Sequence, residues 1–419
     1  MITQLFPKDF QRYLALPVLG LIMDSYAGWL IEQQYTRRSS RYELRMAAHV
    51  CTFLQNRGFY RCEDVNENDL QACYRLFRRK FPKEEGSVHT LTRFLAERAL
   101  LKPSPAPELS HKDNHLSAFN AHLLNDRGYA PSTIRRQVRI ASEFLDWMNF
   151  EKDHDHLRFM NQTDIEGFVR QEGKRIGRVG LQKVTSSLRN FLRFLASRGF
   201  IPSGLDQQID TPRVYRQEKL PRALPWTTVQ AFLSSIDRST DIGKRDYAVF
   251  SLMTTYGLRA CDIVALKLED IKWRAHYIQI YQTKTATPLS LPLTHEVGSA
   301  IYTYLKEVPR NGRYRELFLR ERAPAGPLKS TAVISAFQSW SIKSGLDIPF
   351  KGTHCLRHSY ALHLCRRGLS LKTIGDILGH KSIESTSVYI RLNTEDLRDV
   401  ALNLPTDHNG QKEGGHESK

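Results

Sequence analysis

The last third of the chain holds side chains whose types and spacing could carry out chemistry. His354, Arg357 and His358 fall within one helical turn in HCLRHSYALHL (354–364), and His380 and Tyr389 follow in GHKSIESTSVYIRL (379–392). Imidazoles move protons near neutral pH, guanidinium groups bind oxyanions, and an activated phenolic oxygen is a nucleophile. The pattern indicates either a reaction centre or a pair of helices with a polar face.

Two further candidates lie upstream, and each candidate also has an ordinary interpretation. Arg259 stands in YGLRACDIVALKLEDI (256–271), after a glycine and at an expected helix start, and Lys284 stands near the tip of an expected hairpin. Taken singly they are a surface arginine and a loop lysine. His354 and His358 at i and i+4 lack the glutamate of HExxH, so they do not make that zinc motif.

Taken together, these residues resemble the tyrosine recombinase (integrase) family. The matching text is YGLRACDIVALKLEDI, then QTKT followed by LPL, then THCLRHSYALHLCRRGLSLKTIGDILGHKSIESTSVYIRL, and the resemblance covers roughly residues 115–400. One departure is the hairpin turn TAT, which lacks the glycine often found there. The resemblance implies a nucleophile with five catalytic partners and two supporting residues. These are Tyr389 with Arg259, Lys284, His354, Arg357 and His380, supported by Asp262 and His358.

The resemblance implies a site-specific DNA recombinase that works through a 3′-phosphotyrosyl intermediate and a Holliday junction. Two arginine forks would match the non-bridging phosphate oxygens, His354 and His380 would assist the tyrosine, and Lys284 would protonate the departing 5′ oxygen. A phosphotyrosyl ester conserves the bond energy, so no ATP, metal or other cofactor is expected. The sequence contains no Walker loop, and no carboxylate cluster suggests two-metal chemistry.

The implied partners are double-stranded recombination sites and further copies of the protein. Four protomers would form the synapse, and the segment TEDLRDVALNLP (394–405) would dock as a helix into a neighbouring protomer. Accessory proteins or partner recombinases would add to this assembly. The additional N-terminal residues favour an integrase or transposase of a mobile element over a minimal chromosome-dimer resolver.

Two other functions remain open at this point. A type IB topoisomerase-like enzyme uses similar residues to nick and reseal DNA, and it would relax supercoiled plasmid without producing recombinants. A catalytically inactive DNA-binding regulator is the alternative from another class. Because every expected catalytic position is filled, the sequence favours an active enzyme.

Composition independently points to a polyanionic partner. The 419 residues include 61 Lys and Arg against 44 Asp and Glu, a formal charge of +17, which suits nucleic acid or an anionic membrane surface. No run of 18 apolar residues occurs, so no membrane span is expected. The six cysteines form no CxxC pair and are expected to be reduced thiols of a cytoplasmic protein. The resemblance implies that this protein is associated with the nucleoid.

Proline-rich, polar stretches divide the chain. KPSPAPELSHKDN (102–114) and IDTPRVYRQEKLPRALP (209–225) read as linkers. We expect a mainly α fold with a small antiparallel β-sheet in its C-terminal domain. The expected parts are a helical N-terminal domain (1–105), a helical core-binding, SAM-like domain (113–207), an integrase-type catalytic domain (220–404) and a disordered tail (405–419).

The core-binding domain is expected to present basic helix faces. The helix 131–148 opens with Pro131 and an N-cap candidate, Ser132, and its arginines fall away from its apolar face. A second helix, within 184–200, repeats this pattern. The DNA-contact candidates are Arg135, Arg136, Arg139, Arg189 and Arg193. A solvated helix face is the competing interpretation for each of them.

Two patterns remain. HYIQIYQTKTATPLSLPL (276–293) alternates Tyr277, Gln279 and Tyr281 with Ile278, Ile280 and Gln282, which predicts a strand and then a hairpin. RFLAERALL (93–101) matches RFLASRGFI (193–201) at five of nine positions, and DVNENDLQACYR (64–75) echoes FMNQTDIEGFVR (159–170). The N-terminal domain is therefore either a degenerate repeat of the next domain or simply another helical domain.

Overall fold

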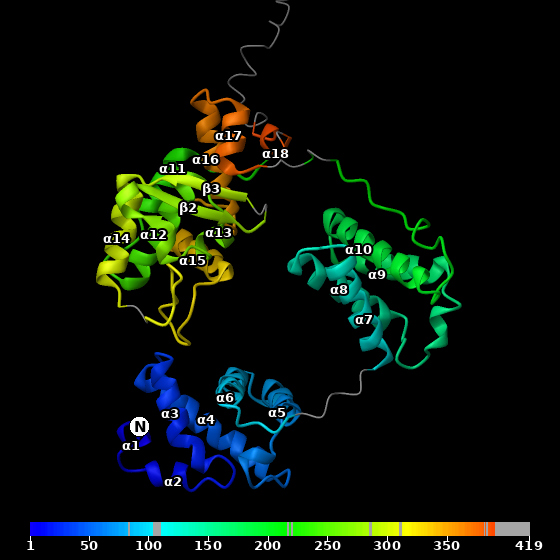
Figure 1. Cartoon of the computed structure of the whole chain (residues 1–419), viewed down its shortest axis with the longest axis vertical. Coiled ribbons are helices and arrows are strands. Elements are labelled where there is room, and N and C mark those ends of the chain that lie inside the picture. Colours follow the sequence, from blue (N-terminus) through cyan, green and yellow to red (C-terminus); the bar gives the residue numbers. More distant parts are fainter. Residues whose placement is uncertain are drawn as a thin grey trace, which may run out of the picture. The chain divides into compact units, whose positions relative to one another are not determined.

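The computed structural model describes residues 1–82, 84–103, 110–215, 218, 221–284, 287–309, 312–380, 382 and 384–389. The chain divides into two compact units. Figure 1 labels the helices and strands of both. The helical unit comprises residues 16–20 and 46–218, and the sheet-containing unit comprises residues 1–15, 21–45 and the chain from 219 onward. The boundary falls within the long helix α4 (Arg37–Gln55).

The described part of the helical unit is built from helices. They are α5 (Glu67–Lys80), α6 (Glu85–Glu97), α7 (His111–Ala121) with a π-turn at His122–Asp126, α8 (Pro131–Trp147), α9 (Gln162–Arg175) and α10 (Arg178–Ser197). Helices α7 and α8 pack together, and α10 packs on both α8 and α9. Phe119, Phe144 and Phe191 are fully buried where these helices meet.

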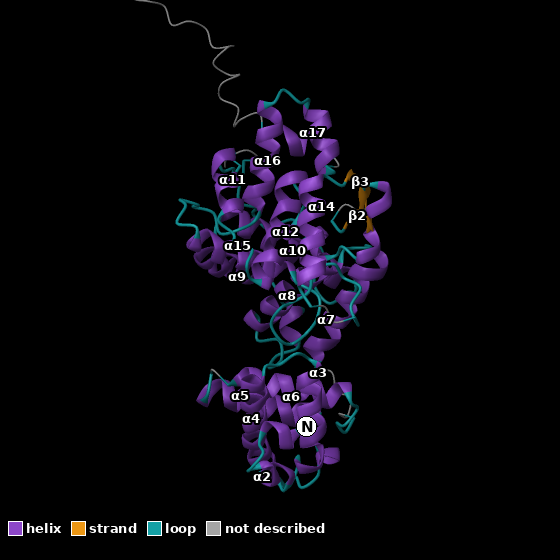
Figure 2. Cartoon of the chain, turned by 90° about the vertical axis from the view of Figure 1, so that its left-hand side faces the viewer, coloured by secondary structure: helices purple, strands orange, loops and turns teal. Residues whose placement is uncertain are grey.

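The sheet-containing unit is also mainly helical. Its helices are α1 (Ile2–Leu5), α2 (Phe10–Leu14), α3 (Met23–Glu32), α11 (Trp226–Ser234), α12 (Asp241–Tyr256), α13 (Ala260–Val264), α14 (His295–Glu307), α15 (Ser330–Lys343), α16 (His354–Arg366), α17 (Leu371–Leu378) and α18 (Glu384–Ser387). One antiparallel sheet has the order β1 (Ile271–Lys272), β2 (Tyr277–Gln282), β3 (Thr287–Pro292). Figure 2 shows how little of the chain is strand. The predicted fold class is confirmed.

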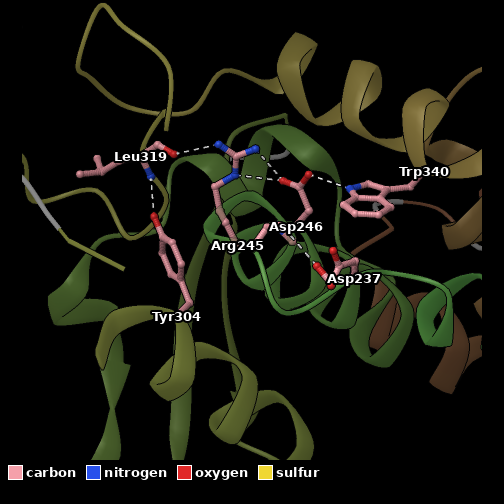
Figure 3. Close-up of polar contacts among 8 residues, drawn as sticks. Asp237, Arg245, Asp246, Tyr304, Leu319 and Trp340 are labelled. Atoms are coloured by element: carbon pink, nitrogen blue, oxygen red, sulfur yellow. Dashed lines mark hydrogen bonds and ion pairs between the residues drawn. The ribbon is translucent and has the colours of Figure 1, made fainter. Parts of the chain in front are cut away.

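Helix α12 is the centre of the larger core. It is buried on nearly all sides, and α11, α14, α15 and α16 pack against it. Its buried Arg245 donates through Nε and NH2 to Asp246 Oδ1 (2.9 and 2.7 Å) and through NH1 to the carbonyl of Leu319 (3.3 Å). Trp340 of α15 donates to Asp246 Oδ2 (2.9 Å), so this network, shown in Figure 3, joins α12 to α15 and to the 319 segment.

Some local predictions need correction. Ser132 does not cap α8: Pro131 occupies the first helical position and Ala130 is the N-cap residue, because proline needs no intrahelical N–H partner there. Ser110 caps α7 by accepting from the amide of Asp113, so the helix begins inside the stretch expected as linker. The hairpin is confirmed in its strands, but β1 was missed because two residues carry no alternation.

Some predictions concern residues outside those that the structure describes. The tail 405–419 and the docking segment 394–405 lie outside the described residues, as does the hairpin tip at 285–286. None of the six cysteines, all of which lie in the described residues, forms a disulfide, and four of them are buried. Within the described part of the chain, no helix is both long and apolar enough to cross a bilayer.

Candidate active site

Arg259 is held where α12 turns into α13. Helix α12 ends at Gly257, which adopts a left-handed φ of +62°, and Arg259 is the N-cap residue of α13. Its NH1 lies 3.4 Å from Gln282 Oε1 and 3.7 Å from Asp262 Oδ2. Asp262 is buried and accepts from the amide and hydroxyl of Thr283 (3.0 and 2.6 Å). The predicted acidic residue thus ties α13 to the end of β2 and faces the arginine.

Arg357 lies deeper, in the first turn of α16. It is 3% exposed, and its NH1 and NH2 donate to the carbonyls of Gly257 (2.6 Å) and Leu378 (2.8 Å). Burial, assisted by the charge of Arg259, lowers the pKa of Arg357 to about 10, so it remains a cation at neutral pH. A guanidinium has five N–H donors, so these two bonds leave donors on the same fork for an anionic ligand.

Gln282 links the two arginines, and the sequence analysis assigned it no role. It lies on the buried face of β2 with Ile278 and Ile280, and its Nε2 donates to the same Leu378 carbonyl that Arg357 uses (3.2 Å). The sequence offers one indication of this role: Gln282 is a polar residue at a position of the strand where the alternation predicts an apolar one. Gly379, with φ +65°, follows Leu378, and a Cβ there would lie 2.3 Å from the Gln282 amide.

Tyr389 is buried in this site. It is 2% exposed and packs with Ala361, Ile374 and Leu378. Its hydroxyl lies 3.1 Å from Nδ1 of His358. Burial, together with the charges around it, lowers the pKa of His358 to about 4, so the ring is neutral at pH 7 and its Nδ1 can accept the phenolic proton.

Two effects act on the pKa of Tyr389 in opposite directions. Burial raises the pKa of the Tyr389 hydroxyl, whereas the nearby charges of Arg357 and Arg259 act to lower it. Because these arginines favour the phenolate while the pocket disfavours it, loss of the phenolic proton would require a specific acceptor. His358 is the side chain within hydrogen-bond distance of that oxygen.

The remaining predicted residues surround this pair. His380 follows the turn at Gly379, its Nδ1 lies 2.8 Å from the hydroxyl oxygen of Thr386, and its ring stacks toward Tyr389 at 14° with centroids 6.5 Å apart. Burial and the nearby arginines lower its pKa to about 4. The pKa of the partly solvent-accessible His354 is lowered by desolvation and then by the charges of Arg357, Arg259 and Lys284.

Lys284 is exposed in the turn after β2, and its positive charge contributes to the lowered pKa of His354. The structure therefore brings together all eight predicted site residues, and it differs from the expectation in one assignment. The tyrosine bonds to His358, which was expected only to support, and not to His354 or His380. Among the described residues, no group of three or more His, Cys, Asp or Glu side chains could hold a metal ion.

The arginines predicted to contact DNA fall into two groups. Arg135, Arg136 and Arg139 are exposed along α8, where Arg139 pairs with Glu143 one turn later (2.6 Å). Arg189 and Arg193 instead anchor the segment after α10. Arg189 donates to the Ile209 carbonyl (2.5 Å) and Arg193 to Asp206 Oδ2 (2.6 Å), so both have partners within the unit. Their DNA contacts stay a prediction.

Comparison with known proteins shows the family of this chain. The model of the phage integrase family matches residues 224–396, and that of the phage integrase N-terminal SAM-like domain matches residues 116–199. The chain is 32% identical over 388 residues to "Putative integrase/recombinase y4rA" of Sinorhizobium fredii (strain NBRC 101917 / NGR234), across 91% of this chain and 93% of that protein. It is 30% identical over 288 residues to tyrosine recombinase XerD of Listeria monocytogenes serovar 1/2a, across 67% and 95%.

Solved structures share the fold. The XerH site-specific recombinase bound to a palindromic difH substrate, in a post-cleavage complex, matches with a TM-score of 0.54 at 17% identity, over 69% of this chain and 86% of that one. A lambda integrase tetramer bound to a Holliday junction matches with a TM-score of 0.50 at 18% identity, over 72% and 85%.

Proposed function

Because this chain belongs to the phage integrase family of tyrosine recombinases, we propose that it is a site-specific DNA recombinase that cleaves each strand with Tyr389. One observation carries the assignment of the nucleophile. Tyr389 is buried beside two arginines from different elements and is hydrogen-bonded to a histidine whose lowered pKa keeps it neutral. A tyrosine that served only as packing would need none of these partners.

In the cleavage step, the Tyr389 oxygen attacks the scissile phosphorus and its proton passes to Nδ1 of His358. The bond from phosphorus to the 5′ oxygen breaks, and Lys284 protonates that oxygen. The product is a 3′-phosphotyrosyl ester and a free 5′ hydroxyl, so a 5′ hydroxyl from the other duplex reverses the reaction without ATP. Two such exchanges pass through a Holliday junction.

The arginines stabilise the charge that develops on the phosphorane. Arg259 and Arg357 present forks to its non-bridging oxygens, and both are fixed before the substrate arrives by Gln282, Gly257 and Leu378. Prepositioned donors of this kind cost no reorganisation in the transition state. His354 and His380 lie near both arginines and would complete the donor set around the phosphate.

The domain organisation we propose follows the two matched segments. Residues 113–207 form the DNA-binding core-binding domain and residues 220–404 the catalytic domain. Four protomers assemble on two duplex sites, as the lambda integrase tetramer does on its junction, with accessory or partner recombinases joining them. The similarity to an integrase/recombinase over 91% of the chain supports integration or transposition of a mobile element. Acting on chromosomal DNA would associate the protein with the nucleoid.

Tyr389→Phe tests the chemistry. On a nicked suicide substrate carrying candidate element ends, the wild type traps a covalent protein–DNA adduct, and the Phe variant binds the same DNA without forming one. Tyr281→Phe, at an exposed tyrosine of β2, is the matched control and keeps full trapping. Adduct formation by Tyr389→Phe would refute the nucleophile. Relaxation of plasmid by the wild type without recombinants would indicate a topoisomerase-like enzyme.

Cleavage is proposed to occur in cis, because Tyr389 bonds to a histidine of its own chain. A mixture of Tyr389→Phe and Arg357→Ala protomers contains no chain with a complete site, so it forms no adduct. If tyrosines were donated between protomers, the mixture would regain adduct.

A further inference from the structure

The N-terminal helices repeat the turns of the family-matched helical domain, one after another. Gln34 and Gly128 both adopt a left-handed φ (+63° and +59°), and each is followed by a tyrosine and then, two residues on, by the long helix α4 or α8. The long helices therefore begin at an offset of 94 residues. A left-handed φ is unfavourable for a residue with a Cβ, so Gln34 does not adopt it by default.

The turns that follow α4 and α8 correspond, and so do the turns that follow α6 and α10. Gly58 and Asn149 are left-handed (φ +86° and +51°), and the next amide bonds to the carbonyl five residues earlier, at 3.2 and 3.1 Å. Ala99 after α6 and Gly199 after α10 show the same arrangement (φ +52° and +72°), with bonds of 2.9 and 3.0 Å. Asn149 and Ala99 carry a Cβ, so the shared geometry is not a consequence of glycine alone.

The third helices share a reciprocal cap. Asn66 caps α5 and forms a capping box with Asp69, and Asn161 caps α9 and forms one with Asp164, at an offset of 95. Helices α5 and α6 pack together, as α9 and α10 do. The offset is 94 at the start of the long helices, 91 at their ends, 95 at the caps of α5 and α9, and 100 after α6 and α10. Helices α5 and α9 have equal lengths, α4 is two residues longer than α8, and α6 is seven residues, about two turns, shorter than α10.

The charged residues correspond as well. At the offset of 94, Arg41 and Arg45 of α4 match Arg135 and Arg139 of α8, which are the predicted DNA contacts. Arg38 extends the α4 row at a spacing of three and four residues, which is one helix face. Residues 1–103 carry 16 Lys and Arg against 11 Asp and Glu, a net +5, and residues 113–207 carry 14 against 11, a net +3.

The α4 row is also less neutralised than its counterpart. Arg139 pairs with Glu143, whereas the equivalent of Glu143 in α4 is the exposed His49. Arg38 and Arg45 are exposed and take part in no ion pair among the described residues. Arg41 is half-buried, and its guanidinium carbon lies 4.9 Å from the centre of the Phe6 ring. Its positive charge therefore lies between those of Arg38 and Arg45 but closer to the protein interior.

We propose that α3–α6 are a second, diverged copy of the helical DNA-binding domain α7–α10, and that this copy grips duplex DNA through the Arg38, Arg41 and Arg45 face of α4. The protein would then have two such domains per chain ahead of its catalytic domain. The contacts are to phosphates, so the second copy adds affinity and steep salt dependence without reading sequence. The inference rests on the proposed role of α8 in DNA binding.

The test measures salt dependence in the full-length protein. Binding of a random-sequence duplex is followed by fluorescence anisotropy at several salt concentrations, because each lost phosphate contact lowers the slope of log K against log salt by about 0.9. Arg38→Gln/Arg45→Gln is expected to lower the slope by about 2, and Arg135→Gln/Arg139→Gln to do the same. Arg61→Gln/Arg79→Gln changes charge equally elsewhere in the N-terminal helices and is expected to leave the slope unchanged.

The outcomes separate the two proposals. An unchanged slope for Arg38→Gln/Arg45→Gln beside a reduced slope for the α8 pair overturns the second DNA-binding copy and leaves the proposed function standing. Unchanged slopes for both pairs overturn the α8 assignment from which the inference starts. If Arg38→Gln/Arg45→Gln keeps the slope but loses cooperative binding of protomers, the face contacts protein and the inference is wrong. Equal thermal midpoints exclude misfolding as the cause of a change.

Discussion

The hydroxyl of Tyr389 and Nδ1 of His358 lie 3.1 Å apart in one chain, although 31 residues separate them in sequence. Helix α16 supplies the histidine, and the turn after α18 supplies the tyrosine. The acceptor that we propose for the phenolic proton is therefore a different histidine from the two that the family resemblance first suggested.

His358→Gln is expected to slow strand cleavage by about 10²–10⁴, the usual value of a general base, without weakening DNA binding. A substrate with sulfur in place of the 5′ bridging oxygen distinguishes this role from that of an acid, because a thiolate leaves without a proton. The sulfur substrate should rescue Lys284→Ala but not His358→Gln. Rescue of both variants alike would contradict the assignment of His358 as base.

Gln282→Leu removes the amide that holds Arg259 and joins it to the Leu378 carbonyl. We expect cleavage to fall by about 10-fold to 100-fold, since losing one prepositioned hydrogen bond costs roughly 1–3 kcal/mol. The matched control is Gln279→Leu, at an exposed position of the same strand, which should cleave at the wild-type rate. Equal rates for the two variants in single-turnover cleavage would remove Gln282 from the site.

Asp246→Asn breaks a buried ion pair far from the chemistry. Arg245 would be left charged and uncompensated in the α12 core, which costs about 3–5 kcal/mol of unfolding free energy. Urea denaturation should show the midpoint falling accordingly. Glu269→Gln, which breaks the exposed Arg315–Glu269 pair, should leave the midpoint unchanged. A midpoint insensitive to Asp246→Asn would mean that the network in Figure 3 does not stabilise the fold.

Lowering the pH from 7 to 4 is expected to reduce the stability of the folded protein through His358 and His380. The pKa values of His358 and His380 are about 4 in the folded protein, below the ordinary value of about 6.5, so the unfolded chain binds more protons between these pH values. Stability conferred by the neutral rings is complete above pH 6.5 and declines toward pH 4, by at most about 1.4 kcal/mol per pH unit for each ring. Thermal midpoints from pH 7 to 4 measure it.

His380→Asn should flatten that dependence, and His49→Gln, at an exposed histidine of α4, should not. An identical pH dependence in wild type and His380→Asn would show that the ring does not carry this linkage.

Much of this arrangement was predictable from local patterns. The spacing of His354, Arg357 and His358 needs only one helical turn, and alternation across Tyr277–Gln282 needs only a strand. The contacts between Gln282 and Leu378, and between Tyr389 and His358, depend on packing of segments far apart in sequence, which no local pattern contains. The matching caps at Asn66 and Asn161 could be seen in the sequence only as a weak similarity, because few residues of the two segments around them are identical.

Gly257 and Gly379 bear on any attempt to engineer this enzyme. A methyl group at 257 would lie 2.6 Å from a Leu378 methyl carbon, and one at 379 would collide with the Gln282 amide. Mutant libraries aimed at new target sites should therefore keep both glycines. The varied positions should lie on exposed helix faces, where a changed side chain contacts solvent or substrate and leaves the catalytic residues in place.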